Sequence, residues 1–98
     1  MKIEIGTRAQ RQVERINNRW QGHADYPLLF EEELEEAFRD LLAMPHLGTR
    51  YPTAKRPHVM RLLLKKSKYH LYYSLERDQA VLVIHSVWSA RRKRGPKL

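Results

Sequence analysis

Several side chains in the second half of the chain are of the types that can cleave RNA without a metal. The set comprises Arg61, Lys65, Tyr73 (or its neighbour Tyr72), His85 and Arg91. Such cleavage requires a base for the 2′-hydroxyl, cations for the charge that develops on the phosphate, and an acid for the leaving oxygen. Arg61 and Lys65 supply the cations, because their spacing places both on one face of a strand. The acid and the base stay open, since His85 also suits a buried position in an apolar strand.

A cluster of cations follows a tryptophan near the end of the chain. Its members are Trp88, Arg91, Arg92, Lys93, Arg94 and Lys97. A tryptophan beside arginines is a common anchor at interfaces, whereas a run of like charges is also typical of a disordered tail. We predict that this cluster, from Trp88 to Arg94, binds the target of the protein.

Charge is distributed unevenly along the 98 residues. The net charge is +8, yet the segment from Asp25 to Asp40 contains seven acidic residues and one arginine. The rest of the chain is therefore strongly basic. A field of this sign favours nucleic acid, a ribosome or an acidic protein segment as partner, and a well-solvated basic surface is the simpler alternative.

The sequence lacks the usual patterns of metal and cofactor sites. Its five histidines show no His-x-x-x-His spacing, it has no cysteine, and it has no glycine-rich phosphate loop. We expect no metal, no cofactor and no small-molecule substrate. No apolar run approaches the roughly 20 residues of a membrane span, and residues 1–3 are too short and polar for a signal peptide. We therefore expect a cytoplasmic protein without a membrane partner.

The start of the chain predicts a strand followed by a helix. Residues 2–5 alternate in the manner of a short strand, which Gly6 ends. Thr7, with Gln10 three residues later, forms a capping-box pattern. A helix is then predicted over residues 8–20.

A second helix is predicted over residues 26–44. Gly22 suits a left-handed end of the first helix, and Asp25 suits the N-cap of the second. A connection this short predicts a helical hairpin. The first helix carries a row of arginines, and we expect this row to offset the repulsion among the glutamates of the second; the row is Arg8, Arg11, Arg15 and Arg19.

Three strands are predicted after an irregular loop over residues 44–58. They cover residues 59–66, 69–76 and 80–87, and the short connections between them predict antiparallel hairpins. The last of them is apolar at nearly every position, which indicates a strand inside the sheet.

Together these elements predict a single α+β domain over residues 1–98. The order is strand, helix, helix, strand, strand, strand, which gives a helical hairpin packed on a mostly antiparallel four-stranded sheet. A basic tail is expected at about residues 89–98.

Four short motifs, in this order and spacing, resemble those of a known family. They are L-x-x-x-P-x-L-G at residues 41–48, V-M-R-L-L-L at 59–64, Y-H-L-Y-Y at 69–73 and V-W-S-A-R-R-x-R-G-P at 87–96. The chain resembles the RelE/ParE toxins of bacterial type II toxin-antitoxin pairs, and the ParE branch in particular, over nearly its whole length.

The resemblance implies a small basic toxin that inhibits growth, stabilises plasmids, and is neutralised by a cognate antitoxin. In this family the antitoxin wraps the toxin with an extended segment and a helix. The residues of this chain expected to meet it are Val13, Ile16, Trp20, Leu34, Phe38 and Leu41.

The two branches of the family imply different targets. ParE relatives poison DNA gyrase, and RelE relatives cleave mRNA on the ribosome. Nucleases of the family usually carry a late tyrosine or histidine, but this chain has neither after His85, and Ser89 stands where histidine is frequent. The resemblance therefore favours a non-enzymatic gyrase poison that binds its target through Arg61, Trp88, Arg91, Arg92, Lys93 and Arg94. A ribosome-dependent mRNA endoribonuclease is the alternative, and a non-toxic nucleic-acid-binding module is the second alternative.

Overall fold

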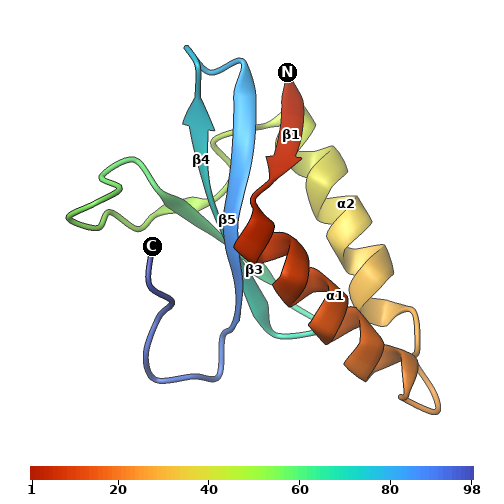
Figure 1. The fold of residues 1–98 in the computed structure, drawn as a ribbon. Helices are drawn as coiled ribbons and strands as arrows, with labels where there is room; N and C mark the ends of the chain where they lie inside the picture. The colour runs from red at the N-terminus through yellow and green to blue at the C-terminus, as the bar shows by residue number, and fades with distance from the viewer.

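The computed structural model describes residues 1–98 and contains two helices and five strands. In chain order they are β1 (Lys2–Ile5), α1 (Thr7–Gln21), α2 (Leu29–Ala43), β2 (Thr49–Arg50), β3 (Met60–Leu64), β4 (Tyr69–Glu76) and β5 (Val81–Ser89). The strands form one sheet in the order β1-β5-β4-β3-β2, and both helices lie against one of its faces (Figure 1). The opposite face carries no helix, and we call it the open face.

Strand β5 lies between β1 and β4, as its continuous apolar sequence predicted. It runs parallel to β1, from the pair Lys2 and Val81 to the pair Ile5 and Ile84, and antiparallel to β4. Because β1 stops at Ile5, β5 has no neighbouring strand on that side beyond Ile84. Helix α1 begins immediately after Gly6 and takes the place of the missing strand.

One apolar core fills the space between the sheet and the helices. Its buried members are Ala9, Ile16, Phe30, Leu34, Ala37, Leu41, Met60, Leu64, Tyr69, Leu71, Tyr73, Leu82, Ile84 and Val87. Alternate residues of β3 and β4 belong to this set, which confirms the period of two predicted for those strands. Burial of this apolar surface is the main force that holds the helical hairpin on the sheet.

The sheet has one strand more than predicted. The additional strand, β2, comprises only Thr49 and Arg50, which pair with Arg61 and Met60 of β3. Two residues carry too little alternation to be recognised in a loop rich in proline and glycine. The other predicted features, an α+β domain with a helical hairpin on a mostly antiparallel sheet, are confirmed.

The predicted cap of the first helix is wrong. The N-cap is Gly6 and no side chain caps the helix, because Thr7 is already the first helical residue. Gly6 also donates its N–H to the carbonyl of Ile84 at 2.9 Å, so the strand passes directly into the helix without a separate capping residue.

The turn between the helices also differs from the prediction. Gly22 has a φ of −79° and is not left-handed, and α2 begins at Leu29 with Leu28 as N-cap instead of Asp25. Pro27 explains the later start, since the residue before a proline is disfavoured in the helical region. The ring of His23 holds the turn instead, by accepting the N–H groups of Asp25 and Tyr26 at 3.3 and 3.2 Å.

The expected attraction between the arginines of α1 and the glutamates of α2 is absent. The two ion pairs of the structure both involve Glu4, which pairs with Lys2 and Arg77. On α2, Glu33 instead accepts the backbone N–H groups of Lys66 and Ser67 at 2.7 and 2.9 Å. This carboxylate therefore fastens the turn between β3 and β4 to the helix.

The side chain of Tyr73 fixes the loop that leads into β2. Its hydroxyl donates to the carbonyl of Pro45 and accepts the N–H of Gly48, both at 2.9 Å. A Cβ at Gly48 would lie 2.8 Å from that hydroxyl, so only glycine fits there. Burial raises the pKa of Tyr73, and the N–H of Gly48 opposes this rise.

Replacing Tyr73 with phenylalanine should destabilise the fold by about 1 to 2 kcal/mol, because the Gly48 amide and the Pro45 carbonyl would lose their partner. Denaturant unfolding measures this difference. Tyr26→Phe is the matched control, since Tyr26 is 59% exposed. A Tyr73→Phe protein as stable as the control would show that the hydroxyl does not hold the loop.

Candidate functional site

A group of aromatic rings around one arginine lies on the open face. Arg61 of β3 places its guanidinium 4.9 Å from the ring centroid of Tyr51, in the loop after β2. The Tyr51 ring meets Tyr72 of β4 edge to face, with centroids 5.1 Å apart, and His70 lies 6.0 Å from Tyr72. We call these four residues the Arg61 cluster.

Burial controls the protonation of this cluster. The pKa of Tyr72 is raised mainly by burial, and Arg61 opposes this rise. The pKa of His70 is lowered by burial and, to a lesser extent, by the positive charge of Arg61. At neutral pH the cluster therefore holds a neutral phenol and a neutral imidazole beside a permanent cation.

His85 lies at an irregularity of the sheet. Tyr72 pairs with Ser86 and Tyr73 pairs with Ile84, so His85 is the extra residue of a bulge on β5. Its Nε2 is 2.7 Å from the hydroxyl oxygen of Ser74, and that hydroxyl donates to Glu76 at 2.8 Å. Burial and then the charge of Arg56 lower the pKa of His85, and Glu76 opposes them.

The basic tail folds back across the open face (Figure 1). The indole of Trp88 donates to the carbonyl of Arg94 at 2.7 Å, and the Arg92 guanidinium lies 4.3 Å above the indole ring. Gly95 passes close to Tyr51, because a Cβ there would lie 2.5 Å from the Tyr51 hydroxyl. Further along, the carbonyl of Lys97 accepts a hydrogen bond from Arg8 at 2.6 Å. The tail is irregular in structure but makes specific contacts.

Of the predicted nuclease residues, the structure brings Arg61 and Tyr72 together in the Arg61 cluster. The others lie apart from this cluster. Lys65 follows the end of β3 and lines a pocket against α2. Tyr73 points into the core, with its hydroxyl bound to the loop. His85 is engaged with Ser74, and Arg91 lies beside Arg19 and Trp20 near the end of α1.

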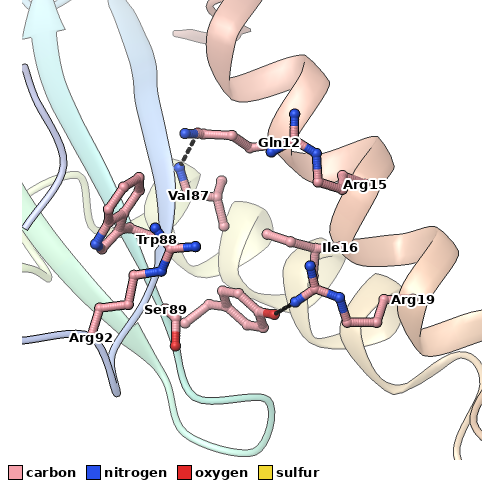
Figure 2. Close-up of a pocket in the computed structure, with 9 residues that line it drawn as sticks. Gln12, Arg15, Ile16, Arg19, Val87, Trp88, Ser89 and Arg92 are labelled. Carbon is pink, nitrogen blue, oxygen red and sulfur yellow. Dashed lines mark hydrogen bonds between the residues drawn. The ribbon is translucent and has the colours of Figure 1, made fainter.

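A groove separates α1 from the end of β5 (Figure 2). It is lined by Gln12, Arg15, Ile16, Arg19, Tyr69, Val87, Trp88, Ser89 and Arg92, and has a volume of about 240 Å³. Figure 2 shows Gln12 reaching from the helix to the strand, where its side-chain oxygen accepts the N–H of Val87 at 2.8 Å. This N–H is on the strand edge that β1 leaves free, and Gln12 satisfies it.

The side chains expected to meet an antitoxin fall into two groups. Ile16, Leu34 and Leu41 are buried in the core between helices and sheet. Val13, Trp20 and Phe38 are only partly buried and pack at the margin of that core. The second group alone therefore offers surface to another molecule in this conformation.

A family model described as the ParE toxin of type II toxin-antitoxin systems, parDE, matches residues 3–94. The chain belongs to this family. The membership confirms the resemblance inferred from the four motifs, and it makes the protein a toxin of the RelE/ParE superfamily.

Solved structures of RelE proteins share the fold. The isolated E. coli RelE toxin has a TM-score of 0.63 and 19% identity, and the match covers 93% of this chain and 85% of that one. The intact E. coli RelBE toxin-antitoxin complex has a TM-score of 0.62 and 20% identity, with coverage of 92% and 96%. No curated protein matches the sequence. Neither helix of the toxin is long and apolar enough to cross a membrane.

Sequence reasoning missed three residues of the open face. Tyr51 lies in the proline-rich loop, and only the return of this loop to the sheet brings it to Tyr72. Ser74 becomes a partner of His85 because of the bulge, which the sequence does not signal. His70 could have been found, since it lies on the same strand face as Tyr72.

Substituting Glu76 with glutamine should lower the pKa of His85 further, because the negative charge of Glu76 raises that pKa in the native protein. An NMR titration of the His85 ring protons measures the shift. Glu4→Gln serves as the control, since Glu4 pairs with Lys2 and Arg77. An unchanged or higher pKa in Glu76→Gln would contradict the link through Ser74.

Proposed function

We propose that this toxin arrests bacterial growth by poisoning DNA gyrase in the cytoplasm, and that a cognate antitoxin neutralises it. The main support for this proposal is the packing of the tail on the open face. There Trp88 and Arg92 stack, and the backbone of Arg94 is fixed by the indole. A rigid aromatic side chain with stacked arginine is the kind of anchor on which protein interfaces depend.

The charge of this surface supports a large anionic target. Arg91, Arg92, Lys93 and Arg94 are exposed, and Arg61 adds a further cation on the open face. Neither ion pair of the structure involves these side chains. Gyrase bound to DNA presents the negative potential that such a surface attracts.

Ribonuclease activity is the second candidate, and the Arg61 cluster favours it. RNA cleavage requires a base, an acid and a cation that stabilises the charge on the phosphate. The neutral imidazole, the neutral phenol and the guanidinium of this cluster are groups of these kinds. However, Tyr72 is only 2% exposed, and Tyr51 and the tail lie over it. RNA would reach this hydroxyl only after the tail moved, so binding of a target is the better supported function.

Alanine at Arg91, Arg92 and Arg94 together should abolish growth arrest on induction, and should abolish inhibition of supercoiling by purified gyrase, because the charged anchor is lost. The matched control removes three exposed arginines elsewhere, at Arg11, Arg39 and Arg77. Circular dichroism confirms that both variants fold. Full inhibition by the Arg91, Arg92 and Arg94 variant would reject this surface as the gyrase site.

We propose that the groove between α1 and β5 takes an acidic, extended segment of the antitoxin. Arg15, Arg19 and Arg92 line it with no carboxylate among them, and on the adjacent strand edge the N–H of Val87 is satisfied by a side chain, that of Gln12. A peptide strand could replace this one side-chain contact with a ladder of backbone hydrogen bonds. Val13 and Trp20, on the partly exposed margin of α1, extend the same contact surface.

Charge reversal by Arg15→Glu should weaken antitoxin binding about tenfold, because a like charge would then face the acidic segment. Isothermal titration calorimetry with the purified antitoxin measures the change. Arg11→Glu provides the same change of charge on α1 outside the groove. Equal losses in the two variants would show that only the overall charge of the helix matters.

A further inference from the structure

A second basic pocket lies beside the middle of β5, at His85. It is bounded by the start of α1, the loop between β2 and β3, and the end of the tail. Its lining includes Arg8, Lys55, Arg56, His85, Lys97 and Leu98, and its volume is about 370 Å³. We call it the Arg8 pocket.

The charges in the Arg8 pocket are unbalanced. The side chains of Arg8, Lys55, Arg56 and Lys97 line it, and no lining side chain is acidic. Both ion pairs of the structure are formed elsewhere, at Glu4. Four like charges gathered from three separate segments repel one another, so the folded pocket favours a bound anion.

In the free protein the guanidinium groups of Arg8 and Arg56 donate hydrogen bonds to main-chain oxygens of the tail. Arg8 donates to the carbonyl of Lys97 at 2.6 Å, and Arg56 donates through Nε to a main-chain oxygen of Leu98 at 3.3 Å. The carbonyl of Lys97 satisfies a hydrogen bond of Arg8, but it is neutral and leaves the charge of Arg8 uncompensated. An anionic oxygen in the same place would make shorter and stronger bonds with the same donors.

His85 gives the pocket a fixed wall. Its ring is held by Ser74, which is itself buried and bonded to Glu76. Arg56 is close enough to His85 to lower its pKa. The cations of the loop and of α1 therefore stand around an imidazole whose position is set by the sheet.

We propose that the Arg8 pocket binds a phosphate group of a nucleic-acid backbone, which displaces the main-chain oxygens of Lys97 and Leu98. Guanidinium groups match phosphate in both charge and hydrogen-bond geometry. The pocket opens at the surface and adjoins the tail, whose cations Arg92 and Arg94 continue the basic surface toward Trp88. This site does not depend on gyrase being the target, since it would engage DNA or RNA held by any target.

Two titrations of the full chain test the proposal. ¹H–¹⁵N NMR spectra are recorded with inorganic phosphate, and separately with a short single-stranded DNA oligonucleotide without terminal phosphates, both against sodium chloride at equal ionic strength. The proposal predicts that each ligand shifts the side-chain Nε–H signals of Arg8 and Arg56. The amide signals of Lys97 and Leu98 should shift at the same ligand concentrations, because the tail leaves the pocket.

A pair of charge-matched variants decides whether the pocket or the overall charge binds. Arg8→Gln with Arg56→Gln should weaken the oligonucleotide affinity about tenfold. Arg11→Gln with Arg39→Gln, which removes the same charge from exposed positions outside the pocket, should weaken it less than about twofold. Equal losses would overturn the proposal. Pocket shifts with phosphate but no effect of Arg8 and Arg56 on the oligonucleotide would also overturn it, since the site would then take free phosphate only.

Discussion

The short parallel pairing of β1 with β5 determines where the chain leaves the sheet and where α1 lies. It ends at the pair Ile5 and Ile84, whereas β5 continues to Ser89. The chain must then leave the sheet at once, and α1 starts with Gly6 as its cap. Helix α1 therefore lies along the uncovered half of β5, with Gln12 on the edge N–H of Val87. The groove, the Arg8 pocket and the position of the tail all depend on the chain leaving the sheet after Ile5.

The two faces of the sheet have consequently different roles. The helical face is closed by the apolar core, so partners reach it only at the margins, where Val13, Trp20 and Phe38 remain partly exposed. The open face has no helix to cover it, and its cover is the tail, held by side-chain donors of Trp88, Arg8 and Arg56. Contacts between a side chain and a backbone carbonyl are each worth little in water. A charged ligand can therefore exchange with the tail without unfolding the sheet.

The fold could be predicted from the sequence because its elements carry local signals. The alternation of residues 69–76 gave β4 its observed bounds, and the apolar run after Ala80 predicted a strand inside the sheet. The cap of the first helix was not predictable in the same way. The N–H of Gly6 is bound by the carbonyl of Ile84, which is far away in the sequence.

The site was harder to predict than the fold because its contacts join distant segments. The alternation of β3 places Arg61 on the face opposite the buried Met60 and Leu64, but its neighbour Tyr51 arrives from an irregular loop. Tyr73 was a candidate catalytic residue of the nuclease set. In the structure its hydroxyl is instead hydrogen-bonded to the backbone of Pro45 and Gly48. The tail was expected to be either disordered or a binding surface, and only the structure shows its carbonyls bound by Trp88 of the sheet and by Arg8 at the start of α1. Spacing along a strand predicts which face a residue occupies, but not which loop returns to meet it.

Transcriptome-wide mapping of mRNA ends shortly after induction of the toxin alone distinguishes a toxin that binds gyrase from one that cleaves mRNA. If the open face binds gyrase, growth should stop while mRNA stays intact and DNA supercoiling falls. New mRNA ends in phase with the codons would contradict this account, and would make the Arg61 cluster a nuclease site that the tail uncovers.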